Sequence, residues 1–333
     1  MTTDQSTSPF DTTAETDVTR AGRFRALLDE AVIAPAKILA NDPRALVGLT
    51  IVTLFFALGT IGVAIVPIPY ASDGPNLLSP FQSAKFLLGT DIVGKGIFAQ
   101  LVHATPAMLK MVVSGGLFAT GMATVWGTVA GYKGGNVDQV MMTISDIVMT
   151  IPGLPLVVVL AAFFEPSDPF VVGLLLAVNS WAGFSRALRS QVLTIRQESY
   201  VEASRTIGIG TGAIVLWDIL PNLMPLIAVR AANSARSVIF RSVGLYFIGI
   251  LPFSSFNWGV MMNQAYKSGA LLDMRLAHWF VAPMLTIVVF SLGLILLSQG
   301  LDRIFNPRIR AKHTADTNSD DETDITASVG GNT

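Results

Sequence analysis

The chain contains no cysteine, and its three histidines are scattered at positions 103, 278 and 313. The absence of cysteine excludes disulfides, zinc–thiolate sites and catalysis by a thiol. There is no His-x-x-x-His or Glu-x-x-His pattern, so the histidines do not indicate a metal centre. The sequence also lacks the Gly-x-Ser-x-Gly elbow of a hydrolase. Enzymes that depend on these groups are therefore not indicated.

Charged residues are scarce as well. Asp, Glu, Lys and Arg make up 14% of the 333 residues, whereas hydrophobic residues make up 51%. The mean hydropathy is +0.57. This composition is too apolar for an ordinary soluble domain and indicates an integral membrane protein. The formal net charge of −1 says little about partners, because the charges are concentrated in a few segments.

Six apolar segments are candidates for membrane spans. Only helices close their own backbone hydrogen bonds within one segment in lipid, so the predicted fold is an all-α integral membrane protein with six transmembrane helices. The third span should bend at Pro152. Gly127 and Gly131 form a small-xxx-small pair that favours close helix packing in the second span. The predicted spans are residues 45–66, 109–130, 137–164, 170–184, 223–251 and 279–301.

These spans divide the chain into five parts. We expect a cytoplasmic segment (1–44), the first span (45–66), an external connection (67–108), a five-helix core (109–302) and a cytoplasmic tail (303–333). Residues 1–18 and the acidic tail after residue 312 are expected to be disordered. Residues 20–40 read either as an amphipathic helix at the inner membrane surface or as a plain linker.

Basic residues predict the orientation. If the N-terminus lies inside, fourteen Lys and Arg residues fall in inner segments, and only Lys85, Lys95, Lys267 and Arg275 fall in outer ones. This bias predicts that both termini are cytoplasmic, in a multi-pass protein of the cell membrane. It also places the polar stretch 199–222 in the cytoplasm.

The stretch 199–222 carries the clearest helix-start and helix-end signals of any segment between the spans. Ser199 and Glu202 have the spacing of a capping box, which predicts a helix from Tyr200 to Ile207. Gly208 follows as the expected left-handed residue after its end. On this helix Tyr200, Ala203 and Ile207 share one face.

A second short helix is expected over residues 212–220, capped by Thr211 and closed by Pro221. Ile214 and Trp217 should share one of its faces. Two short helices with apolar faces that project from a membrane protein into water indicate a binding site for a partner protein.

The residues of this stretch resemble a known motif. Glu202-Ala203, Gly208 and Leu220-Pro221-Asn222 resemble the EAA motif of the membrane permeases of ABC importers, although Ser204 and Asp218 depart from the usual pattern. Leu88-Gly-Thr-Asp91 with Gly94-Lys95, Ala130-Gly-Tyr-Lys-Gly-Gly135, Asp146 with Ile151-Pro152, and Asn306-Pro-Arg-Ile-Arg310 resemble the C-type subunit of the dipeptide/oligopeptide/nickel subgroup. The resemblance covers about residues 35–310.

The resemblance implies a permease subunit of an ATP-driven importer that depends on a solute-binding protein. Its implied partners are a B-type permease, two ATPase subunits, an extracytoplasmic solute-binding protein and membrane lipids, with no nucleic acid. The ATPases would bind ATP and Mg²⁺, so this chain would have no cofactor and no ATPase site of its own. The resemblance implies peptides as the expected cargo, with nickel and sugars as the alternatives. The residues implied to couple with the ATPase are Glu202, Ala203, Gly208, Leu220, Pro221 and Asn222.

Charged residues within the spans are a second candidate site. Arg230, Arg236 and Arg241 fall in the fifth span, where each costs roughly 2.5–3.5 kcal/mol at mid-bilayer, so they should face protein or water. They line the translocation pathway, pair with Asp146 or another span, or, where they lie near the span ends, snorkel to the interface. Asp146 itself either pairs with one of them or lies near the inner interface.

A nucleotide site, a secondary transporter and an intramembrane enzyme are the three alternatives to the importer. Residues 89–95 match the first seven positions of a phosphate-binding loop, but Gly96 replaces the Ser or Thr that would hold Mg²⁺, which argues against a nucleotide site. A self-sufficient secondary transporter would need an inverted repeat, and no half matching the Pro152 region is evident. An intramembrane enzyme would need a nucleophile and a base, which Asp146 alone does not supply.

Overall fold

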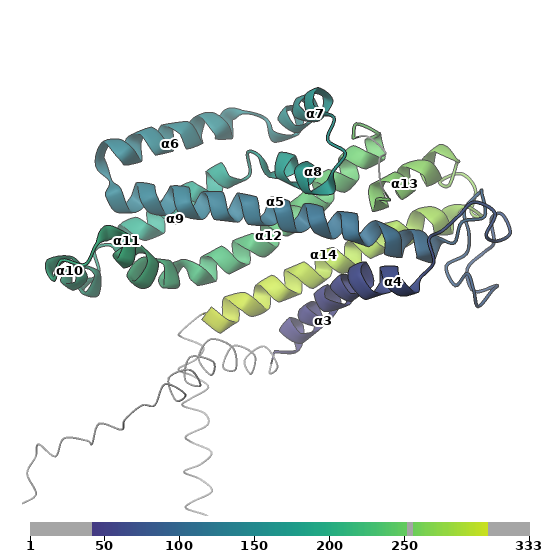
Figure 1. Ribbon diagram of the computed structural model, residues 1–333, viewed down its shortest axis with the longest axis horizontal. Coiled ribbons are helices and arrows are strands. Elements are labelled where there is room, and N and C mark those ends of the chain that lie inside the picture. The colour runs from purple at the N-terminus through teal and green to yellow at the C-terminus, as the bar shows by residue number, and fades with distance from the viewer. Residues whose placement is uncertain (1–41, 252–255, 306–333) are drawn as a thin grey trace, which may run out of the picture.

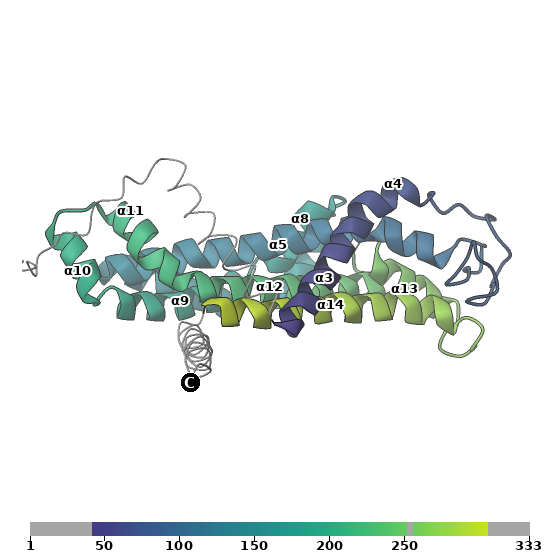
Figure 2. The ribbon, with the colours of Figure 1, turned by 90° about the horizontal axis from the view of Figure 1, so that it is seen from below.

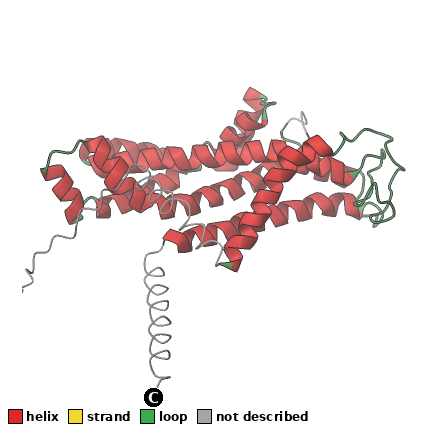
Figure 3. Cartoon of the chain, turned by 60° about the horizontal axis from the view of Figure 1, so that its bottom comes forward, coloured by secondary structure: helices red, strands yellow, loops and turns green. Residues whose placement is uncertain are grey.

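The computed structural model describes residues 42–251 and 256–305. These residues form helices and connecting loops, with no strand among them beyond one isolated bridge between Thr90 and Gly96 (Figure 3). The predicted all-α fold is confirmed. The predictions for residues 1–18, 20–40 and the tail lie outside the described residues, as does the 306–310 motif.

Two of the helical elements are π-helical, and the remainder are α-helices. In chain order they are α3 (Pro43–Ala57), π-helical η2 (Leu58–Gly62), α4 (Val63–Ile65), α5 (Ile97–Lys133), α6 (Gly135–Thr150), α7 (Gly153–Phe164), α8 (Pro169–Ala177), α9 (Trp181–Ile195), α10 (Ser199–Thr206), α11 (Thr211–Ala213), π-helical η3 (Ile214–Ile219), α12 (Leu220–Ile248), α13 (Trp258–Lys267) and α14 (Ala277–Phe305).

The molecule is elongated, and its longest helices run along its length (Figures 1 and 2). α5 has 37 residues, which corresponds to about 55 Å. α10 and α11 lie at one end of the molecule, called here the α10 end. The connection between α4 and α5 lies at the opposite end together with α13, and this is called the α13 end.

Four helices are long and apolar enough to cross a membrane: Pro43–Ile65, Ile97–Lys133, Thr211–Ile248 and Ala277–Asp302. Two further pairs meet the same criteria if each is counted as one broken span. α6 and α7 meet at 84°, and α8 and α9 meet at 58°. Counting each pair once gives six spans at the six predicted places.

The second span begins earlier than the sequence predicts. α5 starts at Ile97, so about twelve residues assigned to the external connection are helical. The polar side chains in this segment favour a connection over a span in the sequence, because the groups that satisfy Gln100 and His103 lie outside the helix. Gln100 Nε2 donates to Asp91 at 3.0 Å and His103 Nε2 lies 2.9 Å from the Val66 carbonyl oxygen, both outside α5, whereas Thr105 donates to the Leu101 carbonyl within α5 at 2.8 Å.

The two broken spans also differ in part from expectation. The predicted bend at Pro152 is confirmed and is a full break, since Ile151 and Pro152 have extended backbones between α6 and α7. The fourth span was predicted to end at residue 184. Instead α8 ends at Ala177, and α9 continues to Ile195 after the break.

Glycines let α5 approach its neighbours closely. A Cβ on Gly127 would lie 2.3 Å from the Ser185 carbonyl oxygen of α9, and one on Gly131 would lie 2.8 Å from Val192 Cβ. The predicted small-xxx-small packing is therefore confirmed, with α9 as the partner helix. Gly115 makes a similar contact with Gly173 of α8.

The stretch that resembles a phosphate-binding loop is a folded turn at the α13 end. The buried Asp91 carboxylate accepts the backbone N–H groups of Val93 and Lys95, both at 2.9 Å, in addition to Gln100. The Thr90 hydroxyl accepts the N–H of Leu78 at 2.9 Å. These groups hold the connection on α5, so their hydrogen-bonding capacity is already used.

Candidate functional site

The end of α10 is a complete helix-termination motif. Gly208 has φ of +90°, its N–H donates to the Arg205 carbonyl at 3.1 Å, and the N–H of Ile209 donates to the Ser204 carbonyl at 3.1 Å. This pair of bonds is a Schellman motif, which satisfies carbonyls that the helix leaves free. The prediction that Gly208 is the left-handed residue after the helix is confirmed.

The start of α10 does not match the prediction. Ser199 is the first helical residue, Glu198 is the N-cap in extended conformation, and no side-chain hydrogen bond caps the helix. The predicted capping box between Ser199 and Glu202 is therefore wrong. The helix begins one residue early, at a position where Ser199 cannot act as the N-cap.

The second predicted helix is not a separate element. Helical structure runs without interruption from Thr211 through η3 into α12, and the N-cap of α11 is Gly210, not Thr211. Pro221 does not close a helix but lies in the first turn of α12. A proline ring clashes with the carbonyl four residues earlier in a regular helix, and the wider π-helical turn of η3 relieves that clash.

The π-helical turn also changes which residues share a face. Ile214 and Ile219, five residues apart, are both buried together with Leu223, whereas Trp217 is 78% exposed. The predicted shared face of Ile214 and Trp217 is therefore wrong. A five-residue hydrogen-bond spacing brings residues i and i+5 to the same side, which a 3.6-residue period does not show.

α10 is attached to the bundle by one side and exposed on the other. Val201 is fully buried, packed in a cluster that includes Ile214 and Leu188. The predicted face formed by Tyr200, Ala203 and Ile207 is exposed, with Ile207 at 79%. The helix thus presents an apolar face outward at the α10 end.

A hydrogen bond ties α10 to the first turn of α12. Asn222 Nδ2 donates to the Tyr200 hydroxyl at 3.1 Å and to the Asp218 carbonyl at 2.7 Å. Partial burial raises the pKa of Tyr200, and the carboxylates of Glu198 and Asp218 raise it further. The amide of Asn222 is therefore bonded within the chain, although the residue is exposed. Leu220 is half-buried and Pro221 is exposed.

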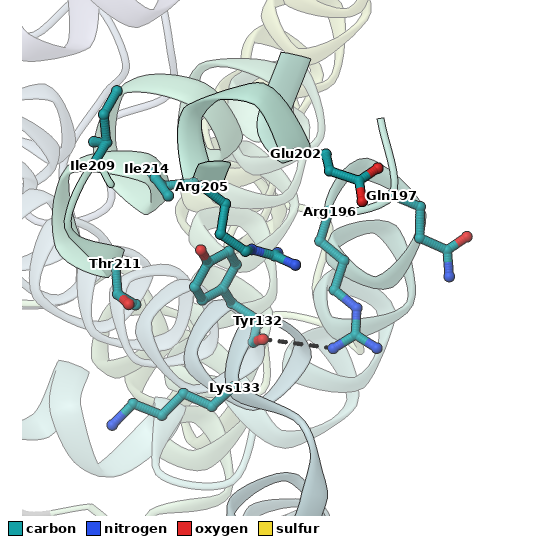
Figure 4. A pocket seen from close by; sticks show the side chains of 9 residues that line it. All are labelled: Tyr132, Lys133, Arg196, Gln197, Glu202, Arg205, Ile209, Thr211 and Ile214. Atoms are coloured by element: carbon teal, nitrogen blue, oxygen red, sulfur yellow. Dashed lines mark hydrogen bonds between the residues drawn. The ribbon is translucent and has the colours of Figure 1, made fainter. Parts of the chain in front are cut away.

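A polar cleft of about 770 Å³ lies between α10, the end of α5 and the end of α9 (Figure 4). Arg196 Nη1 donates to the Gly131 carbonyl at 2.9 Å, and the Arg205 guanidinium lies over the Tyr132 ring at 5.7 Å from its centroid. The cleft is lined by Tyr132, Lys133, Arg196, Gln197, Glu202, Arg205, Ile209, Thr211 and Ile214.

The three arginines of the fifth span lie in different environments. Arg241 of α12 donates to the Leu176 carbonyl at 2.8 Å and to the Ser180 hydroxyl at 2.6 Å, so its guanidinium lies at the break between α8 and α9. Arg230 is exposed, with its guanidinium 5.5 Å from the centroid of the Phe184 ring. Arg236 is half-buried.

Asp146 does not pair with these arginines. Its carboxylate forms an ion pair with Arg186 of α9, and both side chains are 51% exposed. The alternative in which Asp146 pairs with the fifth span is therefore wrong. A second ion pair, Asp138 with Arg189, joins the same two helices.

Comparison with known proteins identifies the family. The family model described as "Binding-protein-dependent transport system inner membrane component" matches residues 123–311. The chain belongs to this family. It is a multi-pass membrane component of a binding-protein-dependent transport system.

Curated relatives match this membrane component over most of its length. The dipeptide transport system permease protein DppC of Bacillus subtilis (strain 168) is 30% identical over 279 residues, covering 82% of this chain and 84% of the relative. The oligopeptide transport system permease protein OppC of the same strain is 27% identical over 273 residues, covering 81% and 87%. A putative peptide permease protein of Brucella suis biovar 1 is 30% identical over 272 residues, covering 80% and 88%.

Two features of this membrane component are missed by sequence reasoning. One is the pair of ion pairs between α6 and α9, although acids eight residues apart on α6 and arginines three residues apart on α9 were a usable signal. The other is the basic cleft behind α10. Its arginines and lysine come from three separate segments, so no local sequence pattern predicts the cleft.

Proposed function

We propose that the chain is the permease subunit of an ATP-driven, solute-binding-protein-dependent importer of peptides. The observation that carries the proposal is α10, a short helix that is anchored by Val201, ended by Gly208 and exposed on its apolar face within the family-matched region. The names of the dipeptide and oligopeptide relatives favour peptides as cargo.

In this proposal α10 docks on an ATPase subunit and transmits its movement to α12. Ala203 is small enough for close approach on the exposed face, and the exposed Glu202 offers a carboxylate at the cleft behind α10. Gly208 permits the turn, while Leu220, Pro221 and Asn222 form the joint with α12. The hydrogen bond from Asn222 to Tyr200 and the unbroken helix from Thr211 to Ile248 support a stiff lever.

The remaining components follow from the same proposal. Two ATPase subunits bind ATP and Mg²⁺, a B-type permease completes the pathway, and a solute-binding protein delivers cargo outside. The α10 end is cytoplasmic, as the bias of fourteen inner to four outer basic residues favours. In this proposal the permease itself has no cofactor and no ATPase site, which is favoured by Gly96 in place of the Mg²⁺-binding Ser or Thr and by the N–H groups of Val93 and Lys95, which already donate to Asp91.

The fifth span borders the pathway in this proposal. Arg230 and Arg236 are the candidates for contact with carboxylate groups of the cargo. Arg241 and Asp146 are not proposed to contact the cargo, because their charged groups already bind the α8–α9 break and Arg186.

Co-purification with an ATPase tests the proposal. The chain is expressed with the genes beside its own, as wild type and as the variants Ala203→Arg and Ile207→Asp. Leu272→Asp is the matched control, because Leu272 is 94% exposed at the α13 end. We expect an ATPase to co-purify with the wild type and the control but not with either α10 variant. Retention of the ATPase by both α10 variants would refute the docking role. Uptake without ATP would favour a self-sufficient transporter.

A further inference from the structure

The cleft behind α10 gathers positive charge without counter-ions. It is lined by Lys133, Arg196 and Arg205 but by only one acidic residue, Glu202. Among the described residues, none of these four forms an ion pair. On the neighbouring helices α6 and α9, by contrast, Asp138 and Asp146 each have an arginine partner. The residues that line the cleft therefore carry a formal excess of two positive charges.

The two guanidinium groups are held in place. Arg196 Nη1 donates to the Gly131 and Tyr132 carbonyls, at 2.9 and 3.5 Å, and the other N–H groups of the guanidinium remain available. Arg205 rests on the Tyr132 ring. Figure 4 shows both guanidinium groups reaching into the same space below Glu202, with Lys133 on the other side of Tyr132. Groups fixed in this way lose little freedom when they bind a ligand.

The cleft lies on the side of α10 away from its exposed apolar face. At 100° per residue, Glu202 and Arg205 lie on average roughly 160° around the helix from Tyr200, Ala203 and Ile207. A protein docked on the apolar face would therefore leave the cleft side uncovered. The occupant of the cleft is expected to be something other than that docked protein.

We propose that this cleft binds a phosphate-bearing anion through Arg196 and Arg205, with Lys133 at the far edge of the cleft, across the Tyr132 ring. Guanidinium forks match phosphate oxygens in two-point hydrogen bonds, and lysine adds a mobile charge. The volume of about 770 Å³ is large enough for a phosphate group together with its substituent. Lys133 is the last residue of α5, and basic residues at the ends of spans lie where the headgroups of anionic lipids lie. The source is either such a headgroup or free phosphate.

The anion would bridge α10 to the bundle. Arg205 belongs to α10, whereas Lys133 belongs to α5 and Arg196 directly follows α9. A ligand that binds Arg205 and Arg196 cross-links α10 to the end of α9. This consequence for coupling rests on the proposed function, whereas the binding itself does not.

Native mass spectrometry of the full chain in detergent tests the binding. The probes are phosphatidylglycerol, phosphatidylcholine and inorganic phosphate, each added separately. The cleft variant is Lys133→Gln with Arg205→Gln. The control is Lys85→Gln with Arg275→Gln, which removes two exposed positive charges from the α13 end. We expect the cleft variant to bind the anionic probe about tenfold or more weakly than the wild type, and the control to bind it unchanged.

Two observations distinguish a lipid headgroup from free phosphate as the ligand. They are the identity of the probe that binds and the change in its adducts in Glu202→Gln. A lipid phosphodiester has no proton to donate, and the headgroup hydroxyls of phosphatidylglycerol can donate to the glutamine carbonyl as well as to the carboxylate. Removing the carboxylate charge should therefore strengthen phosphatidylglycerol adducts. Monohydrogen phosphate can donate to Glu202, so the same variant should weaken phosphate adducts. Preferential binding of phosphatidylglycerol over phosphatidylcholine or binding of phosphate supports the proposal, provided that the cleft variant loses it.

Three outcomes overturn the proposal: no adduct on the wild type, equal adducts on wild type and cleft variant, or equal loss in the control. Loss of ATPase co-purification in the cleft variant without any change in adducts also overturns it, since the cleft would then receive a protein surface. Because adducts are measured without the ATPase, failure here is distinct from failure of α10 docking. Amide exchange in residues 200–207 should slow on binding, and an unchanged rate would contradict the bridge.

Discussion

At the scale of single residues, Gly208 is the position that determines how α10 ends. Its φ is +90°, yet a Cβ built on it would meet no atom within 4 Å. Any effect of a side chain there must come from the backbone conformation and not from a clash. Gly210, two residues later, has the same open surroundings but an ordinary φ of −64°. The two glycines therefore form a matched pair.

Gly208→Ala should loosen the end of α10. A non-glycine residue in the left-handed region costs about 1–2 kcal/mol, so amide exchange at positions 207–209 should accelerate by about fivefold or more. Hydrogen exchange measured by mass spectrometry on the full chain tests this. Gly210→Ala should leave these rates unchanged. Equal acceleration in both variants would mean that loss of any glycine here, and not the positive φ, is responsible.

At the scale of elements, α6 is held to α9 by two ion pairs that differ in burial. The side chains of Asp138 and Arg189 are 13% and 31% exposed, whereas those of Asp146 and Arg186 are both 51% exposed. Solvent screens the second pair more strongly than the first. Ser145 and Ser185 add a hydrogen bond of 3.2 Å between the same helices.

Breaking the two ion pairs should have unequal effects. Asp138→Asn should destabilise the folded chain by about 2 kcal/mol, the scale of a lost hydrogen bond to a charged group. Asp146→Asn should cost about 0–1 kcal/mol, as exposed pairs do. Thermal unfolding of both variants, with Arg189→Gln and Arg186→Gln completing two double-mutant cycles, measures the difference. A coupling energy for Asp146–Arg186 as large as that for Asp138–Arg189 would contradict the argument from burial.

The break between α8 and α9 depends on a residue of another helix. Arg241 donates to the Leu176 carbonyl, which lies in the last turn of α8 where carbonyls lack helical partners. It also donates to Ser180 directly before α9. The guanidinium thereby fixes both sides of a 58° bend.

Arg241→Met should release this bend. The loss of two charge-assisted hydrogen bonds predicts destabilisation by about 2–3 kcal/mol and faster amide exchange over residues 177–181. Arg230→Met is the control on the same helix, since Arg230 is exposed and, among the described residues, its guanidinium has no hydrogen bond or ion pair and lies over the Phe184 ring, a contact worth about 0.5–1 kcal/mol. If Arg230→Met accelerated exchange at the break as much as Arg241→Met, the role assigned to Arg241 would be wrong.

The elements that sequence predicts here are those with a local cause. Span positions follow from apolar runs, the break at Pro152 from its missing N–H, and the turn at Gly208 from its freedom of φ. The early start of α5 could not be predicted, because Gln100 is satisfied by Asp91 only once the connection has folded. The π-helical turn before Pro221 has no propensity signal. The partner of Asp146 and the basic cleft depend on tertiary packing, which brings distant segments together.

At the scale of the whole molecule, the uneven distribution of basic residues follows the long axis of the molecule. The connection between α4 and α5, with Lys85 and Lys95, lies at the α13 end, and α10 lies at the opposite end (Figures 1 and 2). The positive-inside bias therefore predicts that the α10 end faces the cytoplasm. The orientation fixes whether an ATPase in the cytoplasm can reach α10 at all.

Single cysteines measure this orientation without background, because the natural chain has no cysteine. Gly210→Cys places a thiol in open space at the α10 end, and Leu272→Cys places one on a 94% exposed position at the α13 end. A membrane-impermeant maleimide applied to intact cells should label Leu272→Cys but label Gly210→Cys only after the membrane is permeabilised. Labelling in denaturant confirms that each thiol is present. Labelling of Gly210→Cys in intact cells would invert the topology and remove α10 from reach of a cytoplasmic ATPase, so the coupling proposal would fail with it.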